Sequence, residues 1–262
     1  MLRMTAKSVC LVFAGTLFAA TLAAQAPAPK RDISGTWTPE RRGGGIGANG
    51  ASNHTSDGKH EPPYTAAGKA AFMTHKPSNG ITEVGPGEEN DPGHTCDPLG
   101  MPRALTFEQR DVTFVHQAKK TLILTQYDRM WRSAFTDGRT IDMNAEPRWY
   151  GYSIAKWADD YTFVVTTSNI EDRAWLDNAG RPQSDQMSVE EQWHRIDHDN
   201  LELTVTVTDP KFYSAPWVAI NKLKMKLLPE DHDMIEMMCV PSELAAYNVR
   251  HANLGNGITG KK

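Results

Sequence analysis

The sequence predicts an all-β protein, an antiparallel meander of strands that closes into a barrel. From Leu105 onward, short runs of aromatic and β-branched residues follow one another across turns of hairpin length. Residues 201–208 alternate Leu and Val with Glu and Thr, which is typical of a strand with one buried face. A meander of this length hides its edge strands by closing or stacking. We therefore expect a barrel over residues 105–244.

The strands are expected in chain order, beginning with a short one at 33–38. The later ones are expected at 112–117, 121–127, 131–135, 152–157, 161–167, 187–196, 201–208, 217–228 and 234–240. Asp137-Gly138 marks a turn, and Asp-His-Asp-Asn at 197–200 joins two strands of one hairpin. The last two strands are expected to form a hairpin as well.

A long irregular segment rich in Gly and Pro separates the first strand from the rest of the barrel. Together with that strand it makes up residues 25–104, and one short helix is expected near 65–74, where Ala is plentiful and Pro absent. Loops of this length are usually functional or mobile, so we expect the segment to wrap the surface or to act as a lid.

The chain begins with a pattern that predicts export. Arg3 and Lys7 precede an apolar stretch that ends in small residues, the order found in a secretory signal peptide, here 1–24. We therefore expect a periplasmic or secreted protein with no integral membrane segment after cleavage and with a flexible tail at 245–262. The net charge of -4 offers no basic stripe, so nucleic acid is not an expected partner.

Export changes the interpretation of the cysteines. Without the signal peptide two are left, Cys96 and Cys239, in an oxidising compartment. One interpretation is a disulfide that ties the N-terminal segment to the last strand. The other is a reactive thiol or a metal ligand.

A register argument places Glu191 inside the barrel. The Leu/Val face of the strand at 201–208 is buried, and a one-residue slip of the partner strand reverses every side chain. An odd-length turn sets Trp193 against that face and points Glu191 and Arg195 inward. An even turn would bury His194 and expose Trp193, which costs more, so we expect the odd turn.

A buried carboxylate needs a cation or hydrogen-bond donors nearby, or its pKa rises, and Arg132 is a candidate partner of Glu191. The functional interpretation of this pair is an acid/base or ligand-anchoring couple in the lumen. The structural one is a buried ion pair closing one barrel end, or a glutamate that reaches solvent at the rim.

The loop at 169–183 follows a core strand, a position where barrels build pocket mouths. Asp177 is a candidate base or hydroxyl ligand there, Trp175 a candidate stacking residue, and Tyr152 a hydrogen-bond donor into the same cavity. The structural alternative is a self-contained charged loop with Trp175 tucked under it. The ligand-binding candidates are Trp149, Trp175, Trp193 and Asn221.

Neither a metal nor a cofactor is expected. His54, His60, His75, His94 and Cys96 lie in the N-terminal segment. Their spacing fits no compact ligand motif. The sequence has no nucleophile elbow, Walker loop or dinucleotide fingerprint.

Gly35-Thr36-Trp37 on the first strand resembles the Gly-x-Trp signature of lipocalins and other calycins. Further segments resemble a group of secreted bacterial proteins, largely uncharacterised, that are called lipocalin-like. These segments are CDPLGMPR at 96–103, DGR at 137–139, GYSIAKW at 151–157, AWLD at 174–177, DPK at 209–211 and PW at 216–217. The resemblance implies a calycin-like barrel with a small-molecule pocket, and no established reaction. Where that group often carries histidine, this sequence has Tyr152 and Gln183.

We expect a barrel that binds a small, partly apolar molecule in its lumen, since seven tryptophans and several methionines suit such a lining. The alternative is a cofactor-independent lyase, hydratase or hydrolase acting on a glycan-derived or aromatic metabolite. In that case Glu191, Asp177 and Tyr152 would supply acid/base groups, and Arg132 would stabilise developing negative charge. A structural role in the envelope is a third hypothesis. The sequence sets no oligomeric state.

Overall fold

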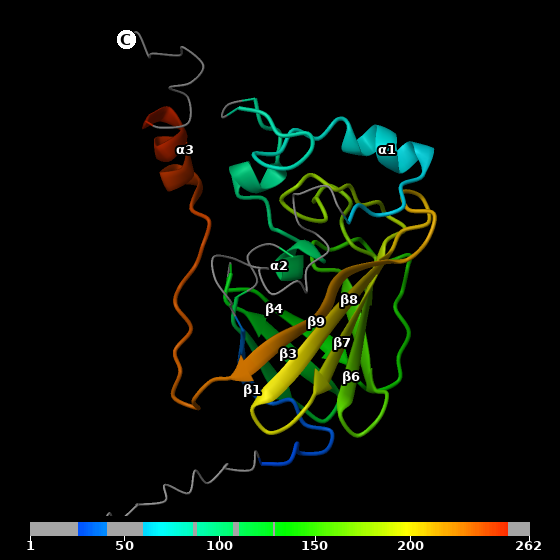
Figure 1. Cartoon of the computed structure of the whole chain (residues 1–262), viewed down its shortest axis with the longest axis vertical. Helices are drawn as coiled ribbons and strands as arrows, with labels where there is room; N and C mark the ends of the chain where they lie inside the picture. The colour runs from blue at the N-terminus through cyan, green and yellow to red at the C-terminus, as the bar shows by residue number, and fades with distance from the viewer. Residues whose placement is uncertain (1–25, 41–59, 86–87, 107–109, 128, 251–262) are drawn as a thin grey trace, which may run out of the picture.

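The computed structural model describes residues 26–40, 60–85, 88–106, 110–127 and 129–250. Over these residues nine strands close into a barrel in the order β1 to β9 (Figure 1). Their bounds are β1 Gly35–Pro39, β2 Val112–His116, β3 Lys120–Thr125, β4 Trp131–Phe135, β5 Tyr152–Trp157, β6 Thr162–Ser168, β7 Ser188–Arg195, β8 Asn200–Thr208 and β9 Trp217–Leu227. The predicted all-β barrel is confirmed.

The first strand closes the barrel. Trp37 of β1 lies opposite Val112 of β2 on one side and Leu227 of β9 on the other. Because every strand then has two neighbours, the barrel offers no long free edge.

One strand pair departs from the expected antiparallel meander. β4 and β5 run parallel and pair only at Ala134–Ser153 and Phe135–Ile154. Parallel neighbours need a crossover connection, because the chain must return to the starting end of the first strand. Residues 136–151, called the crossover connection below, make that return without a helix or a strand. The Asp137-Gly138 turn was thus located correctly, but it does not open an antiparallel hairpin.

Aromatic and aliphatic side chains fill the inside of the barrel. Trp37 and Trp193 are fully buried, and the ring of Phe114 meets that of Trp193 edge-on at a centroid distance of 4.9 Å. Trp37 Nε1 donates to the Ile33 carbonyl at 3.0 Å, so its polar edge is satisfied without water.

Residues before β1 cover the lower end of the barrel in Figure 1. The Arg31 amide donates to the Asp160 carbonyl in the β5–β6 turn at 2.6 Å. Arg195, which points inward as expected, donates to the Asp32 carbonyl at 2.7 Å, and Ile33 is fully buried. The lower end is therefore closed by the chain itself.

The N-terminal segment covers the upper end. Its helix α1, Ala66–Phe72, confirms the expected short helix, and the segment also contains the 3₁₀ turn η1, Pro92–Thr95, and the helical turn α2, Arg103–Thr106. A Cβ at Gly68 would lie 2.1 Å from the Phe212 carbonyl oxygen, so α1 packs directly on the backbone that leads into β9. These elements lie over the barrel end in Figure 1.

The C-terminal part differs from the prediction. Residues 228–240, the C-terminal segment, run along one side of the barrel (Figure 1), and the expected strand at 234–240 forms only an isolated bridge between Met237 and Tyr127. A strand needs a partner, and closure of β9 onto β1 leaves none. Helix α3, Pro241–Arg250, follows where part of a flexible tail was expected.

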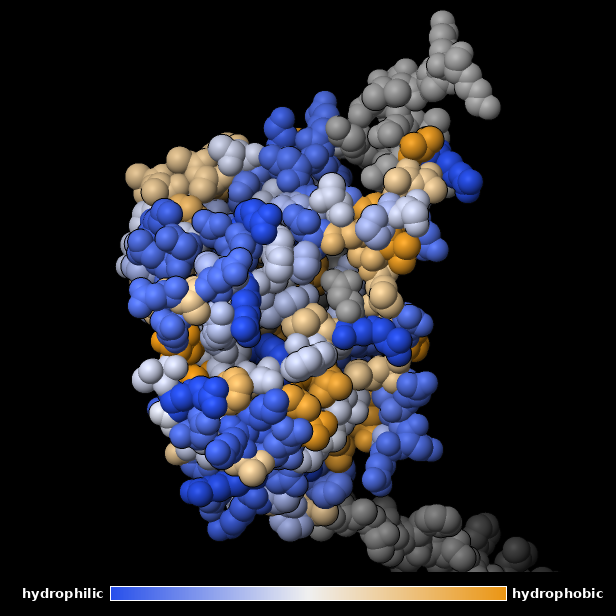
Figure 2. Space-filling view, turned by 180° about the vertical axis from the view of Figure 1, so that it is seen from behind, coloured by the Kyte–Doolittle hydropathy of each residue, from blue (hydrophilic) through white to orange (hydrophobic). Residues whose placement is uncertain are grey.

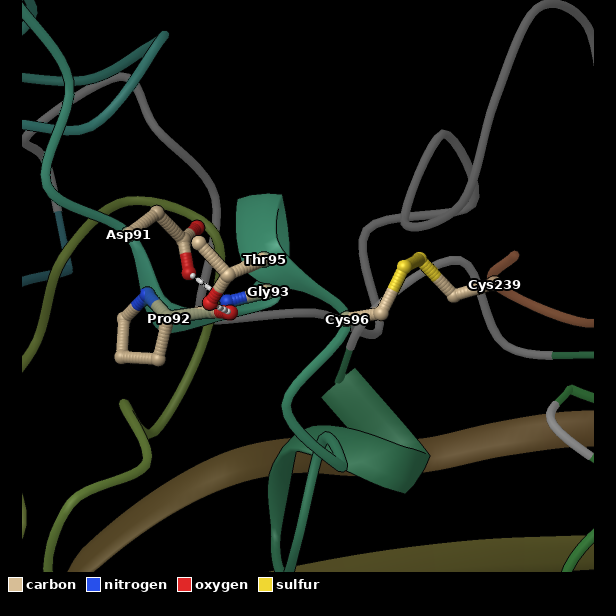
Figure 3. The surroundings of a disulfide bond; sticks show 6 residues. All are labelled: Asp91, Pro92, Gly93, Thr95, Cys96 and Cys239. Carbon is tan, nitrogen blue, oxygen red and sulfur yellow. Dashed lines mark hydrogen bonds between the residues drawn. A yellow bond between two sulfur atoms is a disulfide. The ribbon is translucent and has the colours of Figure 1, made fainter. Parts of the chain in front are cut away.

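The predicted disulfide between Cys96 and Cys239 is confirmed, although Cys239 lies in the C-terminal segment and not on a strand. Figure 3 shows Cys96 directly after η1, where Asp91 Oδ1 accepts from the Gly93 amide at 2.8 Å. Asp91 also forms a buried ion pair with Arg103 at 2.6 Å. The disulfide therefore fastens the C-terminal segment to a turn that is itself held in place.

The expected signal peptide at 1–24 and the end of the expected tail, 251–262, lie outside the described residues. None of the helices in the described ranges combines the length and the apolar character that a membrane crossing requires.

Candidate functional site

A cavity of about 590 Å³ lies between the crossover connection and the outer face of the barrel. Buried Arg132 and Ala134 mark the inner face of β4, so the neighbouring Trp131, Ser133 and Phe135 point outward into the cavity. The crossover connection, all of which is described, contains no helix that could pack on this wall, and an open space remains between the two. The parallel pairing of β4 and β5 is therefore what creates the cavity.

Each side of the crossover connection is fixed by an arginine stacked on an outward ring. The Arg139 guanidinium lies 3.6 Å from the centroid of the Phe135 ring, and that of Arg148 lies 4.2 Å from the centroid of Tyr152. The Tyr152 hydroxyl donates to the Glu146 carbonyl at 2.9 Å. The roof of the cavity is thereby held to both strands of its wall.

At the start of β5 the backbone of Gly151 lies very close to its neighbours. Gly151 has a φ of +61°, and a Cβ there would lie 2.7 Å from both Ile170 and Thr167 side chains. Buried Asn169 donates to the carbonyls of Asp142 and Ala145 at 3.1 and 2.9 Å, which ties the crossover connection to the end of β6.

The predicted pairing of Arg132 with Glu191 is confirmed. The register is the expected one, because Trp193 lies opposite Leu203 and His194 points outward. Glu191 is fully buried and Arg132 nearly so, and Arg132 also lines the cavity. The pair thus reaches from the interior of the barrel to the base of the cavity.

Hydroxyl groups complete the surroundings of the ion pair. Arg132 Nη1 donates to Ser153 Oγ at 3.4 Å and to Thr167 Oγ1 at 3.2 Å, and Trp193 Nε1 donates to Glu191 Oε2 at 3.2 Å. Glu191 Oε1 and Arg132 Nε are buried and have no hydrogen-bond partner among the described residues.

Asp177 and Trp175 lie in the cover of the upper barrel end, not at a pocket mouth. Asp177 is fully buried, pairs with Arg181 Nη1 at 2.5 Å and accepts from the Ala179 amide at 3.0 Å. Trp175 is buried and stacks on the His75 ring at a centroid distance of 4.4 Å. Trp175 is therefore buried, as the structural alternative requires, but the loop is not self-contained, because Trp175 packs on the N-terminal segment.

Arg181 connects this loop to the N-terminal segment through a second carboxylate, Glu61. Burial by itself lowers the pKa of Arg181, but the two carboxylates outweigh it and hold the pKa above its ordinary value. Burial also raises the pKa of Tyr64, which donates to Glu61 Oε2 at 2.8 Å. These contacts fasten the loop at 169–183 to the N-terminal segment over the upper barrel end.

The remaining candidates separate into three places. Tyr152 and Trp149 line the cavity, where both are half-buried. Trp193 lies inside the barrel, next to Glu191. Asn221 is exposed on the outer wall at the irregular part of β9, so the lumen position expected for it is wrong. In the described part of the chain, no hydrogen bond or ion pair joins Asp177 or Tyr152 to Glu191.

A second cavity of about 400 Å³ adjoins the first at Met130 and Trp131. Its other wall is the C-terminal segment, with His232 and Ile235 facing the outer side of β2 and β3. Trp131 is 60% exposed and separates the two cavities. Seen from behind, hydrophobic residues gather in the lower centre of the barrel face and recur along the C-terminal segment at the right (Figure 2).

The histidines of the N-terminal segment do not come together. His94 pairs with Glu89, His75 packs on Trp175, and His54 lies outside the described residues. Within the described ranges, no three His, Cys, Asp or Glu side chains are grouped to hold a metal ion.

Sequence reasoning missed the roof arginines Arg139 and Arg148 and the outward aromatic residues Trp131 and Phe135. A signal was present on β4, where aromatic residues alternate with inward Arg132 and Ala134. Large aromatic side chains on the outer face of a barrel strand indicate that this face is covered.

Comparison of the chain with protein-family models, curated proteins and solved structures found no match.

Proposed function

We infer that the chain is an exported barrel protein of calycin type that binds a small, partly apolar molecule. The observation that carries this proposal is the crossover cavity, the space of about 590 Å³ under residues 136–151. Its volume falls within the range of roughly 300–1,000 Å³ that small-molecule sites occupy. The disulfide supports export, because disulfides persist in oxidising compartments.

The site differs in place from the lumen site that the sequence predicts. Both barrel ends are covered by the chain, and Trp37, Phe114 and Trp193 occupy the interior. The crossover cavity, by contrast, is lined by half-exposed aromatic residues with a buried polar group, Arg132, at its base. An apolar lining with few polar groups is the usual composition of a ligand site.

Filling the cavity tests the proposal. Ser133 lines the cavity from an outward, half-buried position on β4, and Ser188 holds an equivalent position on β7 away from it. The probe is N-phenyl-1-naphthylamine, a neutral aromatic dye that fluoresces when it leaves water. We expect Ser133→Phe to lower dye affinity at least about tenfold and Ser188→Phe to leave it unchanged. The ring at position 133 would take up space that the dye needs, and the loss of two methylene-sized contacts, at about 0.8 kcal/mol each, is already worth about tenfold. Equal affinity in both variants, or no dye binding to the wild type, would overturn the proposal.

A further inference from the structure

The crossover cavity has a distinct electrostatic character. Arg132, Arg139 and Arg148 line it together with one carboxylate, that of Asp142. The three guanidinium groups differ in what already occupies their N–H groups. These differences identify the group that is available to a ligand.

Two of the three arginines are already engaged by carboxylates. Arg132 pairs with Glu191, and Arg139 donates from Nε and Nη2 to Asp137 at 2.9 and 2.7 Å. Their charges are therefore largely compensated by groups behind the cavity lining.

Arg148 has no such partner. Among the residues that the structure describes, its side chain stacks on the face of the Tyr152 ring, and no carboxylate or side-chain hydrogen-bond acceptor pairs with it. Asp142, the acidic lining residue, accepts from the Asn144 amide at 2.9 Å. Stacking uses the flat face of a guanidinium and leaves its N–H edge free for the oxygens of an anion.

The backbone of Arg148 is held by hydrogen bonds on both sides, and its exposed side chain is held by the stacking on Tyr152. Its amide donates to the Asn169 carbonyl at 3.3 Å, and its carbonyl accepts from the amides of Gly151 and Glu171, each at 2.9 Å. The Tyr152 ring on which it stacks is held as well, because the Tyr152 hydroxyl donates a hydrogen bond to the Glu146 carbonyl. A preorganised donor loses little entropy on binding, which is a property of ligand sites.

We propose that the crossover cavity takes a small organic anion, with its carboxylate, sulfonate or phosphate oxygens on Arg148. The apolar body of this ligand lies between the outward rings of Trp131 and Phe135 and the crossover connection. This inference rests on the proposed function and adds the chemical class of the ligand. Guanidinium groups bind two oxygens of an oxyanion through two parallel N–H bonds, which a lysine does not reproduce.

Two matched dyes test the inference. N-phenyl-1-naphthylamine is neutral, and 8-anilinonaphthalene-1-sulfonate has the same aromatic body with a sulfonate added. We expect the wild type to bind the sulfonate dye about tenfold more tightly, as one charge-assisted hydrogen bond allows. Added salt should weaken the sulfonate dye more than the neutral one. Far-UV circular dichroism checks that each protein is folded, since the sulfonate dye also binds loosened states.

The variants are Arg148→Gln and Arg148→Lys, with Arg173→Gln as the matched control. Arg173 also stacks on a ring, that of Trp149 at 4.7 Å, but its edge is occupied by Glu171 at 3.1 Å. We expect Arg148→Gln to abolish the preference for the sulfonate dye, Arg148→Lys to restore only part of it, and Arg173→Gln to keep it.

The outcomes separate the two proposals. If both dyes bind the wild type equally and Arg148→Gln changes neither, the anion assignment is wrong while the binding function stands. If Arg173→Gln removes the preference as strongly as Arg148→Gln, general positive charge attracts the dye and the assignment to Arg148 is overturned. If neither dye binds the folded wild type, both proposals fail.

Discussion

The buried pair of Arg132 and Glu191 gives the sharpest prediction about stability. Glu191 Oε2 accepts from Arg132 and from Trp193 Nε1, while Arg132 also reaches two hydroxyls. The two groups therefore keep different numbers of hydrogen-bond partners when the ion pair is broken. Arg132→Met leaves a carboxylate with one indole donor, whereas Glu191→Gln leaves a cation with two hydroxyl acceptors.

Removal of one partner from a buried ion pair costs about 3–5 kcal/mol in the free energy of unfolding. We expect Arg132→Met to lie at the upper end of this range and Glu191→Gln at the lower end. The double variant Arg132→Met with Glu191→Gln should cost less than Arg132→Met alone, because no isolated charge is left inside the barrel. Glu190→Gln, on the exposed face of the same strand, is the control and should change stability by less than about 0.5 kcal/mol.

Urea unfolding followed by circular dichroism measures these differences. The reasoning is refuted if Arg132→Met costs no more than the Glu190→Gln control. It is also refuted if the losses of the two single variants simply add in the double variant, since that would mean that the charges do not interact.

Three further predictions concern the backbone, the disulfide and pH. Gly151→Ala should lower the unfolding free energy by about 1–2 kcal/mol more than Gly138→Ala. Both glycines have a positive φ, but only a Cβ at Gly151 would meet neighbouring atoms. Equal losses in urea titrations would contradict the close approach at Gly151. Replacing Cys96 and Cys239 by serine should lower the unfolding free energy by up to about 5 kcal/mol, from the chain entropy of a loop of 143 residues. Mass spectrometry that finds two free thiols in the exported protein would show that the bond does not form. Burial lowers the pKa of His116, so on acidification the unfolded chain binds this proton before the folded protein does, and stability falls as the pH drops below about 6.5. His116→Gln should therefore reduce the loss of stability between pH 7.5 and 5.5. An unchanged loss would refute this.

The features predicted correctly are those that a local pattern determines. Alternating Leu and Val on β8 fixed its buried face, and the cost of exposing Trp193 then placed Glu191 inside. The helix near residue 65 followed from its alanines, and the cysteine pairing followed from their number once export was expected.

The features predicted incorrectly depend on where the chain goes after a turn. Asp137-Gly138 shows that the chain turns, but not that it crosses over to a parallel strand. Asp177 looked available because its partners, Arg181 and Glu61, come from a loop and from a distant segment. Helix α3 did have a local signal, since Pro241 and Glu243 occupy its first turn, where both residue types are favoured.

The most direct test of the central claim uses the indole N–H signals of the tryptophans in an NMR titration with N-phenyl-1-naphthylamine. Trp131 and Trp149 line the crossover cavity, whereas Trp37 and Trp193 lie inside the barrel. Binding under the crossover connection predicts that the dye shifts the signals of Trp131 and Trp149 and leaves those of Trp37 and Trp193 in place. Shifts confined to Trp37 and Trp193 would place the ligand in the lumen and contradict the account.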